Sequence, residues 1–215
     1  MAFMKKLALD KKNQAQVIRA AVKVLRGGGV IVYPTETAYG LGADFLNPRA
    51  VERVYKIKGR DYNKPLSVLV SSYKMAEEIV SFDQASLKLA KQYWPGALTL
   101  ILNFKEAVAD ELKIANQPTL GLRISANRLA TAIVRKFGQP ITATSANLAN
   151  QPSCYAAAEV IRQFSSQKYQ PDLLLDAGDL PRREASTVVR IINNQVEIVR
   201  PGSVAVKFNK TRIVR

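Results

Sequence analysis

The stretch that most constrains the fold is residues 30–70, where a strand pattern leads into a helix pattern and then back to a strand pattern. The β-branched run at 30–33 is typical of a buried strand, and Thr35 and Thr37 follow it closely. Asn47 before a proline predicts a capped helix, which ends in a basic cluster ahead of the second apolar run. Hydroxyl groups after a strand and cations after a helix are typical of two sides of a ligand site.

The rest of the chain alternates between strand and helix patterns, and several strand patterns follow one another directly. This order predicts an α/β (α+β) fold in which a twisted mixed β-sheet is flanked by helices. A chain of 215 residues is long enough to bury a substantial core, so we expect a single domain. The further strand patterns lie at 97–102, 119–125, 140–144, 173–175, 187–192 and 195–199.

Charge is the unusual feature of the composition, because 32 Lys and Arg residues face 17 Asp and Glu residues, for a net charge of +15. Such a field attracts polyanions, although an excess of lysine can also serve solubility alone. The chain has no histidine, and Cys154 is its only cysteine, which excludes a histidine base, an intramolecular disulfide and a Cys/His metal cluster. No apolar run is long enough to span a bilayer, and residues 1–12 are not typical of a signal peptide, so we expect a cytoplasmic protein without membrane contact.

Two pairs of polar residues stand where α/β folds place ligands, just past the end of a helix or strand. Lys58 and Arg60 could bind a phosphate together, or could stabilise the negative end of the helix dipole. Ser145 and Asn147 follow a strand and could face a ligand, or could cap the turn that follows. Without a histidine, a serine-hydrolase triad at Ser145 is excluded, whereas a Ser-Lys arrangement is not.

Two arginines in strand patterns, Arg123 and Arg200, require an anion, supplied either by a protein carboxylate or by a ligand. The candidate residues together describe a pocket with several cations, several hydroxyls and no pair of nucleophile and base. Such a pocket suits a nucleoside triphosphate and a small acid that reacts with it. The rate would then come from positioning and charge neutralisation.

Seven motifs occur along the chain in the order YPTETAYGLG, KIKGRDYNKPL, WPGALTLIL, LGLRI, PITATSANLANQPS, STVV and VRPG. They resemble those of the YrdC/Sua5/YciO family, in its short form. The resemblance implies an open α/β fold with a concave basic face, spanning a domain at 13–204 and followed by a basic tail at 205–215. It also implies a threonylcarbamoyl-AMP synthase, which makes threonylcarbamoyl-adenylate and pyrophosphate from L-threonine, bicarbonate and ATP. The product serves the t6A modification of tRNAs that decode ANN codons.

The resemblance also implies roles for particular residues of this chain. The Lys-x-Arg and Ser-x-Asn signatures fall on the catalytic candidates Lys58, Arg60, Ser145 and Asn147. Nucleotide contacts carry over to Arg60, Lys64, Thr119, Ser145, Ser153 and Arg200. Threonine contacts carry over to Thr37, Arg123, Ala143 (through its backbone) and Ser186. Mg²⁺ would accompany ATP and bridge its phosphates, with few or no protein ligands and no separate metal site.

The chain departs from longer relatives in two respects. Leu69 stands where they often carry histidine, so one threonine contact is expected to be absent or replaced. The sequence also ends soon after its Arg-Pro-Gly motif, so we expect the extra C-terminal domain of the long form to be missing. Such short forms depend on partner proteins that complete t6A transfer, and tRNA or double-stranded RNA is an expected contact.

Two alternatives remain at the level of sequence. One is a non-catalytic RNA-binding or ribosome-maturation protein of the same fold, although the net charge favours contact with a polyanion whether the protein is this or the enzyme. The other is a YciO-like paralogue with a different substrate. The intact pairs Lys58/Arg60 and Ser145/Asn147 favour the enzyme, because an RNA-binding protein would not need a threonine pocket.

Overall fold

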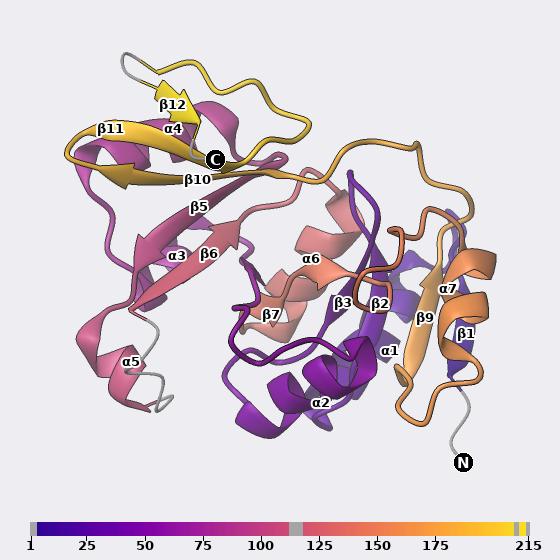
Figure 1. Ribbon diagram of the computed structural model, residues 1–215. Coiled ribbons are helices and arrows are strands. Elements are labelled where there is room, and N and C mark those ends of the chain that lie inside the picture. Colours follow the sequence, from indigo (N-terminus) through magenta and orange to yellow (C-terminus); the bar gives the residue numbers. More distant parts are fainter. Residues whose placement is uncertain (1–3, 112–117, 209–210, 214–215) are drawn as a thin grey trace.

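The computed structural model of the protein describes residues 4–111, 118–208 and 211–213, which form two mixed sheets with helices packed on them (Figure 1). The α/β prediction is confirmed, but strands expected in one sheet are divided between two. The first sheet has the order β1 (Lys5–Ala8), β9 (Leu173–Asp176), β2 (Ile31–Pro34), β3 (Tyr39–Gly42), β8 (Thr144–Ser145). The second has the order β12 (Thr211–Ile213), β11 (Gln195–Arg200), β10 (Thr187–Ile192), β5 (Leu98–Asn103), β6 (Thr119–Arg123), β4 (Val68–Leu69), β7 (Ile141–Thr142).

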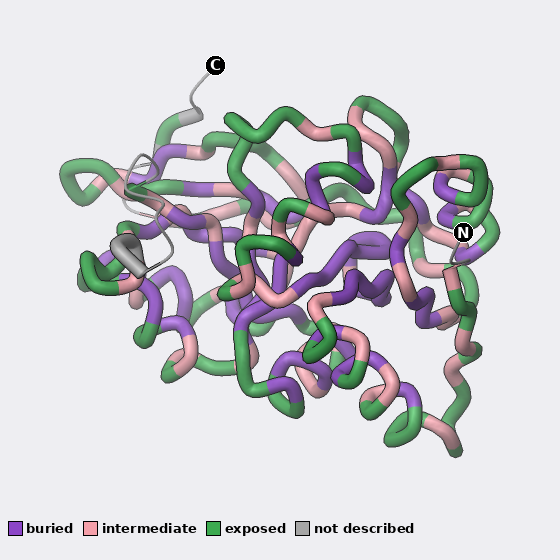
Figure 2. Tube along the Cα trace, turned by 90° about the horizontal axis from the view of Figure 1, so that it is seen from below, coloured by how far each residue is buried: buried purple, intermediate pink, exposed green. Residues whose placement is uncertain are grey.

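Helices cover the first sheet on both faces. α2 (Pro48–Lys58) and α7 (Ala157–Phe164) pack on one face, where Val54 and Val160 belong to the same buried cluster as Val32 of β2. α1 (Gln14–Arg26) and α6 (Arg128–Phe137) pack on the other face, in a second cluster that includes Tyr33. The central strands of this sheet are therefore buried throughout, and Figure 2 shows the buried segments running through the middle of the molecule.

Helices cover one face of the second sheet along β5, and α6 covers the opposite face only at the β4–β7 end, where Leu69 and Ile141 are buried against it. α3 (Tyr73–Ile79) and α4 (Gln84–Tyr93) pack against Leu98, Leu100 and Leu102 of β5. α5 (Glu106–Glu111) follows β5. Because side chains alternate along a strand, Thr99 points to the opposite face, towards the first sheet.

Several local predictions are confirmed. The side chain of Asn47 accepts hydrogen bonds from Arg49 N and Ala50 N and caps α2. The strand patterns at 187–192 and 195–199 are β10 and β11, which form a hairpin with Asn193 and Asn194 at φ 51° and 58°, because both central residues of such a tight turn need positive φ.

Two strands lie outside the predicted domain bounds of 13–204, which stay a prediction. β1 pairs in parallel with β9, and β12 in parallel with β11, so both ends of the described chain contribute to the sheets. Their sequences are short and basic, which hides the strand pattern. Among the described residues, no helix has both the length and the apolar character needed to cross a bilayer.

Candidate functional site

A polar cavity lies between the two sheets and draws its lining from both. The first sheet contributes the end of β2, the following turn, β3 and β8, and the second contributes β5, β6 and β11. Its lining includes most of the residues singled out from the sequence. These are Thr35, Thr37, Arg60, Arg123, Ala143, Ser145, Ser153, Ser186 and Arg200.

The turn after β2 is organised by Thr35. Its Oγ1 donates to the carbonyl of Ala38 at 2.7 Å and accepts from the backbone N–H groups of Thr37 and Ala38. Thr35 therefore supports the turn, as threonine hydroxyl groups often do by bonding to nearby backbone groups. Thr37 is buried, its hydroxyl lies 3.0 Å from that of Thr35, and it lines the cavity.

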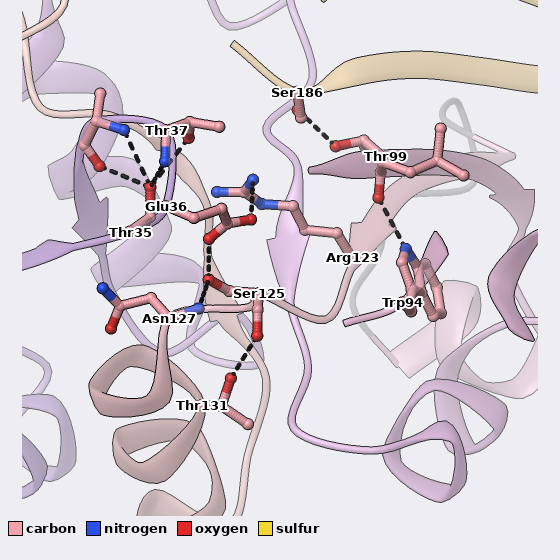
Figure 3. Close-up of polar contacts among 12 residues, drawn as sticks. Thr35, Glu36, Thr37, Trp94, Thr99, Arg123, Ser125, Asn127, Thr131 and Ser186 are labelled. Carbon is pink, nitrogen blue, oxygen red and sulfur yellow. Dashed lines mark hydrogen bonds and ion pairs between the residues drawn. The ribbon is translucent and has the colours of Figure 1, made fainter. Parts of the chain in front are cut away.

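Arg123 is the buried cation of the cavity, with only 7% of its surface exposed. Its Nη1 donates to Glu36 Oε1 at 3.1 Å, and the other Glu36 oxygen accepts from the hydroxyl of Ser125 (Figure 3). The anion that a strand arginine requires is thus partly supplied by the protein. Tyr33 also lines the cavity, and its burial raises the pKa of its hydroxyl group. The nearby positive charge of Arg123 partly opposes this rise in pKa.

Ser186, which directly precedes β10, and Arg200, at the end of β11, form another part of the wall. The Ser186 hydroxyl lies 2.9 Å from Thr99 Oγ1, and Arg200 Nη2 donates to the Ser186 carbonyl at 2.7 Å and to its hydroxyl at 3.1 Å. Loss of solvent around Arg200 lowers its pKa, and the nearby charges of Arg123 and Arg60 lower it further. Guanidinium groups that repel one another across a cavity favour an anion between them.

Arg60 follows the last turn of α2 and folds back on its own loop. Its Nε donates to the carbonyl of Lys64 and its Nη2 to that of Pro65, both at 3.1 Å. Tyr55 also donates to the Lys64 carbonyl, and its ring stacks on Tyr62 with centroids 4.7 Å apart. These contacts fix the loop and hold the Arg60 side chain at the edge of the cavity.

Lys58 and Asn147, by contrast, contact each other behind the cavity wall. Lys58 is 3% exposed, and its Nζ donates to the carbonyls of Ser145 and Asn147 at 2.6 and 2.8 Å and to Asn147 Oδ1 at 3.3 Å. The Asn147 amide donates to the carbonyls of Leu148 and Gln151. Burial, with the charge of Arg60 second, lowers the pKa of Lys58 to about 8. Each signature pair therefore places one residue in the cavity lining and the other in the support of the 145–147 turn.

The structure does not bring every predicted nucleotide contact to the cavity. Thr119 begins β6, at the opposite end of this strand from Arg123, and lines a separate hollow with Asn103 and Ile192. Lys64 is exposed, and only its backbone takes part in the Arg60 contacts. The role of both in binding stays a prediction.

The remaining predicted positions have clear surroundings. Ala143 lines the cavity, and its N–H donates to the carbonyl of Ser67 at 2.7 Å. Leu69, at the position where longer relatives often carry histidine, is fully buried in the cluster beneath α6. Ser67, two residues earlier in the chain, lines the cavity instead.

Sequence reasoning missed several lining residues. Thr99 is hidden because it interrupts an apolar strand, where a single threonine is ordinary. Tyr155 and Arg183 belong to chain segments without secondary structure, and the Tyr155 hydroxyl donates to the Arg183 carbonyl at 2.9 Å. Only the tertiary fold brings these segments to the cavity.

The cavity is electrostatically one-sided. Arg60, Arg123, Arg183 and Arg200 line it, and no Asp or Glu is among its lining residues. Within the part of the chain that the structure describes, no three His, Cys, Asp or Glu residues are grouped so as to hold a metal ion. The arrangement can bind a multiply charged anion and a small zwitterion side by side, and its donor set suits phosphate and carboxylate oxygens.

Comparison with known proteins gives concordant results. The sequence model of the Sua5/YciO/YrdC family, described as telomere recombination, matches residues 23–202. The threonylcarbamoyl-AMP synthase of Bacillus subtilis (strain 168) is 35% identical over 193 residues, which cover 89% of this chain and 55% of that protein.

Two solved structures share the fold. The Pyrococcus abyssi Sua5 complexed with L-threonine has a TM-score of 0.81 and 30% identity, over 93% of this chain and 57% of that one. Escherichia coli YciO has a TM-score of 0.81 and 28% identity, over 96% of this chain and 98% of that one. The chain spans only about half the length of the B. subtilis and P. abyssi proteins. It belongs to the Sua5/YciO/YrdC family.

Proposed function

We propose that the protein is a threonylcarbamoyl-AMP synthase, which converts L-threonine, bicarbonate and ATP to threonylcarbamoyl-adenylate and pyrophosphate. One observation carries this proposal above all. A single cavity unites a buried arginine and hydroxyls suited to an amino acid, Arg123 and Thr37, with the outer arginines Arg60 and Arg200, suited to phosphates. The names of the B. subtilis relative and of the threonine-bound P. abyssi structure support the same activity.

The amino-acid side of the cavity has groups for each part of threonine. The Nη2 and Nε edge of Arg123, away from Glu36, would take the carboxylate. Thr37, the carbonyl of Ala143 and the hydroxyl of Ser186 would take the side-chain hydroxyl and the amine. The ammonium group of threonine would first lose a proton to solvent, and the resulting amine would react with bicarbonate to give a carbamate and water.

The nucleotide side would serve the second step. A carbamate oxygen attacks the α-phosphorus of ATP, the bond to the bridging oxygen breaks, and pyrophosphate leaves. Arg60 and Arg200 would offset the charge of the phosphates, and Ser145 and Ser153 would donate hydrogen bonds to them. Lys58 and Asn147 would act through the turn that they support. Charge neutralisation and positioning would then provide the rate.

Mg²⁺ fits this cavity as a companion of the nucleotide. Because no carboxylate is among the lining residues, the phosphate oxygens and water would hold the ion, and the protein would contribute arginines around it. When bound, Mg²⁺ would lower the charge of the leaving pyrophosphate. The adenylate product would pass to cytoplasmic proteins that transfer the threonylcarbamoyl group to tRNA.

The activity is tested by incubating the purified protein with ATP, Mg²⁺, bicarbonate and labelled threonine. We expect pyrophosphate release that depends on threonine. We expect Arg60→Ala to abolish turnover while circular dichroism stays native, because the lost guanidinium removes charge neutralisation at the phosphates. The control is Arg49→Ala, an exposed arginine in the first turn of α2, which should leave turnover unchanged.

Absence of threonine-dependent pyrophosphate release, under conditions where an established synthase is active, would contradict the proposed function. Normal turnover by Arg60→Ala would leave the activity standing and show that the phosphate side of the site is assigned incorrectly. The two assays therefore separate the reaction from the residue assignment. The RNA-binding alternative predicts no pyrophosphate release by wild type or by Arg60→Ala.

A further inference from the structure

Glu36 lies between two cavity residues in sequence but faces the other way. Thr35 and Thr37 line the main cavity, whereas Glu36 lines a neighbouring hollow together with Gly96 and Glu184. The hydrogen bonds between Thr35 Oγ1 and the backbone of the turn stabilise the conformation in which Glu36 points away from the main cavity. The Glu36 carboxylate is therefore behind Arg123, on the side away from the amino-acid site.

The Glu36 carboxylate is held on both of its oxygens (Figure 3). Oε1 accepts from Arg123 Nη1 at 3.1 Å, and Oε2 accepts from the hydroxyl of Ser125. Ser125 is itself fixed, because its hydroxyl accepts from Asn127 N at 3.1 Å and its carbonyl accepts from Thr131 Oγ1 at 2.8 Å. A chain of contacts thus runs from the beginning of α6 through Ser125 and Glu36 to the arginine.

The ion pair is largely removed from solvent, since the side chains of Arg123 and Glu36 are 8% and 12% exposed. An arginine side chain has several rotatable bonds, and its planar guanidinium recognises a carboxylate by two parallel N–H donors only when its plane is correctly set. Binding Nη1 from behind sets that plane and leaves the Nη2 and Nε edge for a ligand. A carboxylate beside a cationic cavity can therefore assist binding without entering the cavity lining.

We propose that Glu36 is a positioning residue: it orients Arg123 so that the guanidinium presents a preformed fork to the carboxylate of the amino-acid substrate. The inference rests on the proposed function for the identity of that substrate. Glu36 would not touch the substrate, and its effect would be confined to the amino-acid side of the cavity. Arg60 and Arg200, which have their own backbone and hydroxyl partners, would keep their arrangement without it.

The test is calorimetric binding of L-threonine and of ATP to wild type and to three variants. Glu36→Ala should weaken threonine binding about tenfold or more, because misplacement of a binding group costs on this order, and should leave ATP binding within about twofold. Glu36→Gln retains an acceptor for Arg123 and should bind threonine more tightly than Glu36→Ala does. Glu184→Ala, which changes another carboxylate of the same hollow, is the matched control and should bind threonine as wild type does.

Thermal melting of each variant establishes that it is folded at the temperature of the titration. Unchanged threonine binding by folded Glu36→Ala overturns the proposal, and so does tighter binding, which would mean that Glu36 competes with the substrate for Arg123. An equal loss of threonine and ATP binding also overturns it, since that marks a general structural role. Wild type that binds threonine without releasing pyrophosphate would contradict the proposed function and leave this inference intact, whereas wild type that does not bind threonine overturns both.

Discussion

At the scale of the residue, short motifs divide their side chains between two tasks. Arg60 and Ser145 line the cavity, while their motif partners Lys58 and Asn147 lie behind the wall and bind each other. Supporting the wall from behind requires Lys58 to bury a charged group, which is energetically unfavourable. Its ammonium group contacts carbonyl oxygens, and no carboxylate forms an ion pair with it in the described chain. A buried charge of this kind makes stability depend on pH.

The pKa of Lys58 yields a prediction for unfolding. The folded pKa is lowered from 10.5 to about 8, so between these values the unfolded chain holds a proton that the folded chain has lost. Stability rises with pH wherever the unfolded state binds more protons, and this difference corresponds to about 3 kcal/mol. The free energy of unfolding of wild type, relative to Lys58→Met, should therefore rise between pH 8 and pH 10.5.

Urea denaturation of both proteins across this pH range measures the effect. The variant keeps a side chain of similar length, and the other titrating groups are common to the two proteins. Their difference therefore isolates Lys58. Stability curves that stay parallel with pH would show that Lys58 remains charged in the folded protein throughout.

At the scale of the element, helix ends deliver side chains to the cavity. α2 ends at Gly59, whose φ of 60° lies in the left-handed region, and Arg60 follows directly. α6 ends in the same way at Gly138, with φ 84°, but neither Gly138 nor the residue on either side of it lines the cavity. Neither glycine has a neighbouring atom within 4 Å of an added Cβ, so backbone conformation alone determines the effect of substitution.

Matched substitutions of these glycines separate stability from function. Gly59→Ala and Gly138→Ala should each lower the free energy of unfolding by about 1 kcal/mol, the cost of a left-handed alanine. Only Gly59→Ala should also raise the KM for ATP. An alanine at position 59 would relax from the left-handed conformation, and this change of backbone direction would displace Arg60, the next residue. Denaturation and steady-state kinetics measure the two effects. Equal kinetic effects of the two variants would refute a link between this helix end and the nucleotide site.

At the scale of the whole molecule, the site exists because residues of two different sheets meet around one cavity. The first sheet, covered by helices on both faces, contributes the end of β2, the following turn, β3 and β8, and the second contributes Thr99 of β5, Arg123 of β6 and Arg200 of β11. The net charge of +15 belongs to the same scale, since its basic residues are spread along the chain rather than gathered in one segment. Long-range attraction of a polyanion follows from this total.

The charge predicts a strongly salt-dependent contact with tRNA. Each cation that neutralises a phosphate releases a counterion, so the affinity should fall at least tenfold between about 50 and about 200 mM salt. Filter binding or fluorescence anisotropy with a tRNA measures this dependence. Calorimetric threonine binding serves as the comparison and should change much less. Weak binding that is insensitive to salt, or no binding, would count against an RNA contact.

The amino-acid sequence by itself determined the elements and the chemistry. Periodicity, the Asn47 cap and the Asn193-Asn194 turn specify local structure, because each depends on neighbours in the chain. The absence of histidine likewise excluded whole classes of catalysis. The ordered motifs then indicated the family.

Only the tertiary structure determined which of these residues line the cavity and which lie outside it. It divided the strands between two sheets, put Thr119 at the distant end of β6, and brought Arg183 and Tyr155 to the cavity. It also placed Glu36 behind Arg123 rather than in the lining. The physical reason is that a side chain's direction depends on strand register and on contacts between residues far apart in the chain, which spacing along the sequence does not specify.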